Sequence, residues 1–235
     1  MMKIIRLEKN KVKLKLYIGI STLVSFGILI FLFFFAGISY IKPDDVLQDN
    51  ILGTYNFIYM MGLLIGIVAY SIQSSIIFSK IVLEEYKNDG LYLLFSYPIN
   101  RMQQFNAKII ISTVISILLA MAGLMTAISI FTATSYWLEI LPDEFLISNY
   151  FSTLLNILQS ALLIGLIGAF AMLIAFYRKS TVMAITMSII LSAIVCNLLS
   201  IVNINIISII SVLVFVLVII LYVIQTKKIN KLEVL

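Results

Sequence analysis

Few side chains in this 235-residue chain could catalyse a reaction or hold a metal ion. There is no histidine, and the single cysteine, Cys196, lies within an apolar run. A lone cysteine cannot form an internal disulfide, so we interpret Cys196 as a small buried hydrophobic residue. Metal sites built on histidine or clustered cysteine are excluded. The apolar runs contain no ionisable group for a proton relay, and no GxxxxGK[ST] loop is present to bind a nucleotide. We therefore expect no catalytic residue, no metal and no cofactor bound by this chain.

The stretch from Glu84 to Lys108 has the residue pattern of a docking element for another protein. A short helix is expected to end at Gly90, which can serve as a C-cap. Pro98 disfavours helix at the residue before it, and Asn100 with Gln103 has the capping-box spacing that starts a new helix. An apolar tip between these breaks suggests a protein interface, although an amphipathic loop resting on the membrane is the alternative. The predicted site comprises Glu84, Glu85, Gly90, Leu91, Leu93, Leu94, Phe95, Pro98 and Arg101.

Small and polar residues within the apolar runs form a second candidate set. Gly62 and Gly66 make a GxxxG pattern, and Gly165 lies in a stripe of small residues at four-residue spacing. Such stripes let helix backbones approach closely, and polar side chains beside them can hydrogen bond between helices. Internal packing is the simpler interpretation, and a face or lining of a translocation path is the alternative. The candidates are Gln73, Ser74, Asn156, Gln159, Gly62, Gly66 and Gly165.

The elements that must position these residues are membrane-spanning helices. Hydrophobic residues make up 62% of the chain and charged residues only 11%, against roughly a quarter in an ordinary soluble domain. Uncharged runs are long enough to cross the membrane, they do not alternate as barrel strands would, and the run 180–226 is long enough for two helices with a turn near Asn203 and Asn205. We predict an all-α membrane protein with six spans near 17–41, 56–79, 108–131, 152–177, 181–201 and 206–225.

The basic residues predict the orientation of these spans. With six spans, 15 of the 16 basic residues fall on one side, and only Lys42 lies opposite. The positive-inside rule places the basic side, and with it both termini, in the cytoplasm. We expect one transmembrane domain over 1–235, divided into helices 1–2 (17–79), a cytoplasmic loop (80–107), helices 3–6 (108–225) and a tail (226–235).

The amino-terminal segment 1–16 is basic and moderately amphipathic. We expect a helix that lies in the inner membrane interface and is held by anionic lipid, with a merely basic flanking tail as the alternative. The predicted interface anchors are Lys3, Arg6, Lys9, Lys11, Lys13 and Lys15.

This combination resembles the permease subunits of type-2 ABC exporters. The resemblance covers the whole chain: an interfacial amino-terminal helix, six spans, and a loop between spans two and three. In that family the loop forms the coupling helix, a hairpin that docks on the ATPase. The chain departs from some members because it lacks a fused nucleotide-binding domain and a sizeable outer domain before span six. It is similar to small Gram-positive peptide exporters such as the permeases that export phenol-soluble modulins. The matching residues are Glu85, Gly90, Leu93, Leu94, Pro98, Arg101 and Lys108.

The resemblance implies a transporter subunit of the bacterial cell membrane and not an enzyme. ATP and Mg would be bound by a separate ABC ATPase, present in two copies, and a second permease copy or paralogue would complete the complex with membrane lipids. The expected cargo is an amphipathic peptide, such as a toxin, bacteriocin or modulin, or a lipid-like molecule; antimicrobial peptide resistance would follow. No nucleic-acid partner is expected. The alternative is a non-transporting membrane assembly partner or immunity protein.

Overall fold

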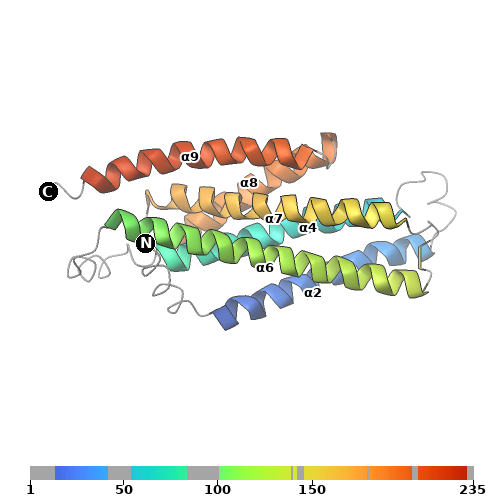
Figure 1. Cartoon of the computed structure of the whole chain (residues 1–235). Helices are drawn as coiled ribbons and strands as arrows, with labels where there is room; N and C mark the ends of the chain where they lie inside the picture. The colour runs from blue at the N-terminus through green and yellow to red at the C-terminus, as the bar shows by residue number, and fades with distance from the viewer. Residues whose placement is uncertain are drawn as a thin grey trace.

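The structure is a computed structural model that describes residues 14–41, 54–83, 101–138, 140–141, 146–178, 180–202 and 206–231. Six long α-helices and one π-helical turn account for nearly all of them (Figure 1). The elements are α2 (Leu14–Ile41), α4 (Tyr55–Phe78), η1 (Ser79–Leu83), α6 (Arg101–Leu138), α7 (Ile147–Ala175), α8 (Thr181–Val202) and α9 (Ile207–Lys231).

All six helices are long and apolar enough to cross a membrane, which confirms the predicted all-helical fold with six spans. A helix is the stable choice for these sequences because every backbone group between its ends is satisfied within the segment. The long uncharged run divides as expected, since α8 ends at Val202 and α9 begins at Ile207. Successive helices run in opposite directions, so the start of α2 and the end of α9 lie at the same end of the bundle, which we name the N/C end (Figure 1).

Two helices are longer than the charge pattern predicted. The third helix, α6, extends from Arg101 to Leu138 instead of 108–131, and α7 begins at Ile147 instead of 152. The start of α6 agrees with the helix that the capping-box spacing of Asn100 and Gln103 predicted, and this helix continues through Lys108 into the third span without interruption. At 1.5 Å per residue, the 38 residues of α6 extend about 57 Å, well beyond a hydrocarbon core of about 30 Å.

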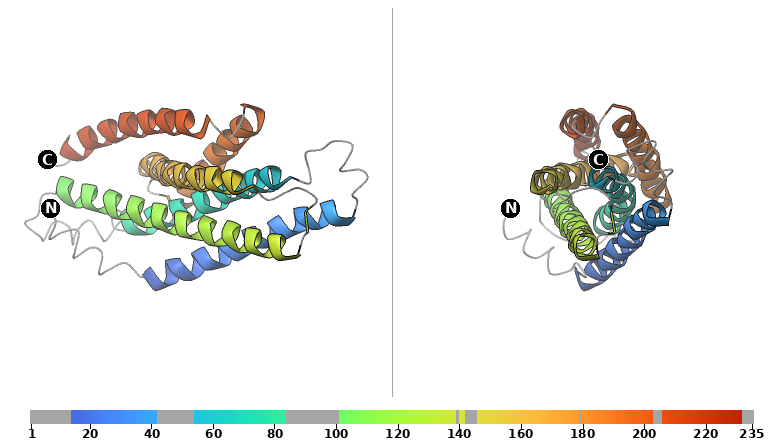
Figure 2. Two further views of the ribbon diagram at one scale, coloured as in Figure 1. Left: turned by 45° about the vertical axis from the view of Figure 1, so that its right-hand side comes forward. Right: turned by 90° about the vertical axis from the view of Figure 1, so that its right-hand side faces the viewer.

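The centre of the bundle is formed by α4 and α7. In their most apolar windows 61% and 67% of residues are buried, against 17% in α2 and in α9. α7 packs against α4, α6, α8 and α9, and α2 packs against α4 and α6. The end-on view in Figure 2 shows α4 surrounded by its neighbours, with α9 and α2 on opposite sides of the bundle. The outer helices therefore present broad apolar faces to lipid, while α4 and α7 hold the bundle together.

A separate hydrophobic cluster closes the N/C end. It joins the last turn of α4 and η1 to α6, α7 and α8 through buried side chains that include Phe78, Val82, Phe105, Leu173 and Ala184. The rings of Phe105 and Phe176 meet edge to face with centroids 5.6 Å apart. This cluster fixes the helix ends from which the loop after η1 departs.

Candidate functional site

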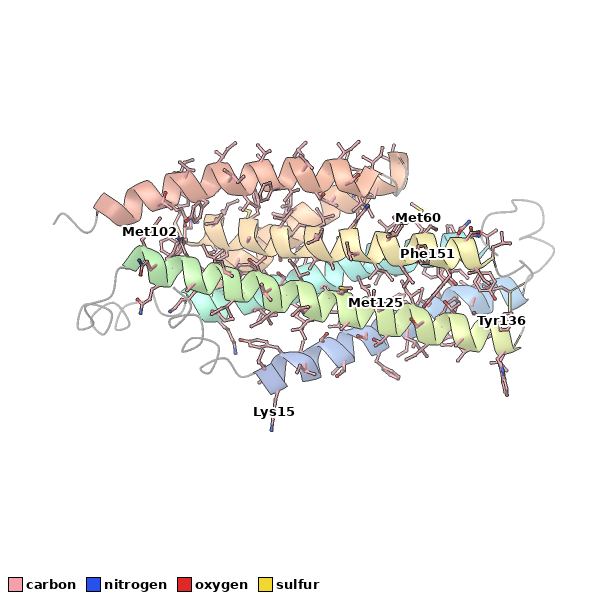
Figure 3. All side chains as sticks on the ribbon, viewed as in Figure 1. Lys15, Met60, Met102, Met125, Tyr136 and Phe151 are labelled. Atoms are coloured by element: carbon pink, nitrogen blue, oxygen red, sulfur yellow. The ribbon has the colours of Figure 1, made fainter. Side chains whose placement is uncertain are left out.

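Most of the predicted docking site and most of the predicted membrane anchors lie outside the described residues. Of the docking residues only Arg101 belongs to a described element, as the first residue of α6. Of the anchors only Lys15 has a described side chain, which is exposed and points away from the bundle at the N/C end (Figure 3). The end of α6 and the start of α7, marked by Tyr136 and Phe151, lie at the opposite end of the bundle (Figure 3). Both predicted sites therefore remain predictions. The docking residues outside the described part are Glu84, Glu85, Gly90, Leu91, Leu93, Leu94, Phe95 and Pro98, and the anchors are Lys3, Arg6, Lys9, Lys11 and Lys13.

The π-helical turn η1 is the described element that leads directly into the predicted docking loop. Its apolar residues Ile81, Val82 and Leu83 are buried, whereas Lys80 is exposed. η1 contacts α6, α7 and α8 as well as α4. π-Helical turns are rare and occur frequently at functional sites. Any displacement of the chain after Leu83 would therefore reach three other helices through η1.

Buried polar side chains gather in the half of the bundle nearest the N/C end. Helix interiors in lipid seldom bury so many hydroxyl and amide groups without a structural or functional reason. They come from α4, η1, α6, α8 and α9 and include Ser71, Gln73, Ser74, Ser75, Ser79, Lys108, Ser112, Ser116, Ser188, Ser192 and Gln225.

Some of these groups join neighbouring helices. The Gln73 Nε2 donates to the carbonyl oxygen of Tyr17 on α2 at 3.2 Å, and the Ser188 hydroxyl on α8 donates to Ser75 Oγ at 3.1 Å. The Gln225 side-chain amide on α9 donates to the Leu173 carbonyl on α7. These bonds hold α2, α8 and α9 against the central pair.

Other oxygens in the same region are buried without a hydrogen-bond partner among the described residues. They include the hydroxyl groups of Ser71, Ser74 and Ser79 on α4 and η1, the hydroxyl of Ser116 on α6, and the Oε1 atoms of Gln73 and Gln225. A buried polar atom left unpaired costs about 1–3 kcal/mol, and hydrocarbon offers no donor. The half of the bundle nearest the N/C end therefore offers hydrogen-bonding atoms to a polar group that enters it.

Lys108, at the start of the predicted third span, is counted with the basic residues that face water on one side of the membrane. In the structure it lies within α6, is only 1% exposed and therefore does not face water. Lysine can bury its aliphatic stem while its ammonium group reaches polar surroundings, so a lysine near a helix end need not mark the end of a span.

The predicted small-residue positions lie at tight helix contacts. A methyl group added at Gly62 would come within 2.8 Å of Leu32 on α2, and one added at Gly165 within 2.7 Å of Ile117 on α6. A methyl group added at Gly66 would come still closer to Leu124 on α6. The Ser74 hydroxyl lies against Gly168 of α7.

The predicted polar residues do not form one lining. Gln73 and Ser74 are buried in the half of α4 nearest the N/C end, whereas Asn156 and Gln159 are partly buried in the half of α7 farthest from it. The structure therefore separates these four residues into two groups on different helices.

Sequence reasoning missed the contribution of α6, α8 and α9 to the polar region. Lys108, Ser112 and Ser116 follow one another at four-residue spacing, which places them on one face of a helix. That spacing could have indicated an inward polar face. The contacts of Ser188 and Gln225 could not have been found in this way, because they depend on how α8 and α9 pack.

The architecture is that of a multi-pass α-helical membrane protein with a buried polar region near one end. Among the residues that the structure describes, no three histidine, cysteine, aspartate or glutamate side chains come together to hold a metal ion.

The sequence matches the family described as ABC-2 family transporter protein over residues 4–197, which is most of the chain. The chain belongs to this family and is thus a membrane transport subunit of the permease type. Membership implies an ABC ATPase as a partner in general terms. Comparison with curated proteins and with solved structures found no match.

Proposed function

We propose that this chain is the permease subunit of an ATP-driven exporter that moves amphipathic peptides or lipid-like molecules out of the cell. A separate ABC ATPase supplies the energy, and the N/C end of the bundle faces the cytoplasm. The orientation is supported by the four cations with described side chains, Lys15, Lys80, Lys108 and Arg178, which all belong to the half of the bundle at that end.

The observation that carries the proposal is the position of η1. It is buried among α4, α6, α7 and α8, and it leads directly into the loop that contains the predicted ATPase docking residues. When ATP closes the ATPase pair, a docked loop would pull on η1. Because η1 continues α4 and is packed on several helices at once, that displacement would reach α4, α6, α7 and α8 together.

The buried polar region in the half of the bundle nearest the N/C end supports the proposed class of cargo. Its hydroxyl and amide oxygens lie among apolar walls, as at Ser74 between α4 and α7. An amphipathic molecule presents both kinds of surface, so it can use the unpaired oxygens without leaving apolar surface in water. Gln73 and Ser74 are therefore proposed to line the cargo path, and Gly66 and Gly165 to let the helices beside it move past one another.

The first prediction tests the docking loop. We expect Leu93→Ser combined with Leu94→Ser to release the ATPase, because buried apolar anchors dominate interfaces and their truncation costs about 2 kcal/mol or more. The measurements are ATPase retention during affinity purification in mild detergent and substrate-stimulated ATP hydrolysis.

The matched control is Leu93→Ile with Leu94→Ile, which keeps the apolar surface and should retain the ATPase. Both doubly substituted proteins should insert normally, since the changes lie outside the six spans. An ATPase that stays bound and active with the serine pair would contradict the coupling role and favour a non-transporting membrane protein.

A further inference from the structure

A cleft opens between α6 and α9 near the N/C end. α9 packs along α7 but contacts α6 at few positions, and in Figures 1 and 2 α7 lies between the two helices. The resulting cavity measures about 290 Å³. Its lining comes from three helices: Asn106, Ile109 and Ile110 of α6, Ala169, Met172 and Leu173 of α7, and Val218, Ile219 and Tyr222 of α9.

The cavity is apolar along its length and polar at one end. The walls are aliphatic except at Asn106 and Tyr222, where the tyrosine hydroxyl donates to Asn106 Oδ1 at 2.7 Å. Its volume is that of roughly ten water molecules at about 30 Å³ each, at the lower limit for ligand pockets. This space suits one hydrocarbon chain and is too small for a folded peptide.

The polar end still has hydrogen-bonding capacity. Because Asn106 Oδ1 accepts from Tyr222, the amide N–H groups of Asn106 are left as donors for a carbonyl or phosphate oxygen. One turn beyond Tyr222, the buried Gln225 donates to the carbonyl of the lining residue Leu173, and its Oε1 has no partner within the described chain. The Asn106 amide, which lines the cleft, thus provides donors for the ester and phosphate oxygens of a lipid.

The helices that flank the cleft carry positive charge at the same end. Arg101 is the first residue of α6, and Lys227, Lys228 and Lys231 fall in the last turns of α9. Neither helix contains aspartate or glutamate. Basic sites between membrane helices on the cytoplasmic side favour anionic headgroups.

We propose that the α6–α9 cleft binds one acyl chain of an anionic phospholipid from the leaflet at the N/C end, with its ester or phosphate oxygens at the Asn106 amide. This lipid is a bound component of the subunit and not its cargo. The inference depends on the cleft, its polar end and the basic residues in the end turns of α6 and α9, so it does not depend on transport or on the ATPase.

Brominated lipids provide the test because the chain has a single tryptophan, Trp137, at the far end of α6. In a Trp137→Phe background, Ile219→Trp places a fluorophore at the cleft. Ile220→Trp places one at the same depth on α9 but outside the lining. Each protein is reconstituted into phosphatidylcholine vesicles with an equal minor fraction of either brominated phosphatidylglycerol or brominated phosphatidylcholine.

At position 219 we expect quenching by brominated phosphatidylglycerol to exceed quenching by brominated phosphatidylcholine several-fold, and at position 220 we expect the two to be equal. Asn106→Leu, which keeps the number and branching of side-chain heavy atoms and removes the amide, should abolish the preference at 219. A second measurement needs no added tryptophan. The purified Asn106→Leu variant should retain less phosphatidylglycerol than the purified unmodified chain.

Two results would overturn the proposal. Equal quenching by both lipids at 219 would mean that ordinary surrounding lipid fills the cleft. Absence of quenching by either lipid at 219, with normal quenching at 220, would mean that protein occupies it. Loss of ATPase binding in the Leu93 and Leu94 variant would leave these readouts unchanged, so the two proposals fail independently.

Discussion

Three helices meet at Gly123, where the absence of a side chain is essential to the contact. The hydroxyl groups of Ser25 on α2 and Tyr70 on α4 lie 2.7 Å apart, and the Tyr70 hydroxyl also donates to the Ser21 carbonyl at 3.2 Å. A methyl group at Gly123 on α6 would overlap the Tyr70 hydroxyl and lie 2.7 Å from Ser25 Oγ. A polar junction in lipid thus depends on one missing Cβ atom.

We predict that Gly123→Ala lowers the free energy of unfolding by about 1–3 kcal/mol, because the added carbon must displace a packed, hydrogen-bonded ring. The measurement is denaturant or thermal unfolding of the purified protein in detergent. In a Tyr70→Phe background the same change should cost clearly less, since the nearest of the atoms that the methyl group meets is gone.

Gly27 on α2 offers the matched control, because nothing lies within 4 Å of a Cβ atom built there. Gly27→Ala should be neutral or stabilising through helix propensity alone. If the two alanine variants unfold alike, the junction at Gly123 does not constrain the bundle.

The sequence predicted only some of the residues that form the buried polar region. The candidate residues Gln73 and Ser74 could be found because they stand out in an apolar run, and both are buried in α4. Lys108 could not be placed, because its charge indicates water while its stem and its position in α6 allow burial. Partners such as Ser188 for Ser75 follow from tertiary packing, which periodicity does not encode.

The helices show which properties of an element depend on composition alone. Six spans follow from long apolar segments, since lipid allows few alternatives to a helix, and the break between α8 and α9 follows from polar residues at 203 and 205. Helix ends are harder to predict. α6 continues outside the predicted span at both ends because residues such as Gln103 and Thr134 are compatible with a helix whether lipid or water surrounds them.

The length of α6 leads to a labelling prediction. On a Cys196→Ser background, Trp137→Cys should react with a membrane-impermeant maleimide added to intact cells, whereas Gln103→Cys should react only after the membrane is opened. Both positions are exposed in the structure and lie near opposite ends of one helix, which is longer than the hydrocarbon core is thick.

Leu118→Cys is the control, because Leu118 is 59% exposed but lies midway along α6 and should be shielded by lipid. It should react under neither condition. Reaction of position 103 from outside intact cells would reverse the proposed orientation and remove the docking loop from the cytoplasm.

Each chain has one predicted docking loop, and its sequence contains no nucleotide-binding loop. An ABC ATPase that closes as a pair would need two such loops, so we predict a complex of two permease chains and two ATPase chains. Native mass spectrometry of the detergent-purified complex should give this composition.

With Leu93→Ser and Leu94→Ser, the permease chains should remain paired and the ATPase mass should disappear. A complex that contains a single permease chain beside two ATPase chains would refute the symmetrical arrangement and require a different partner for the second loop.

The central position of α4 has a consequence for the biosynthesis of the protein. α4 buries its polar face, with Gln73 and Ser74, partly against α7. The ribosome reaches the end of α7 at Ala175, 92 residues after η1 ends at Leu83. At about 5–20 residues per second, translation of that interval takes roughly 5–20 s. During this time α4 is without its main partner, and hydroxyl groups such as that of Ser74, which lies against Gly168 of α7, face lipid or the insertion machinery. A nascent chain that stalls before α7 therefore leaves a helix that is poorly suited to remain alone in the bilayer and is an early target for membrane quality control.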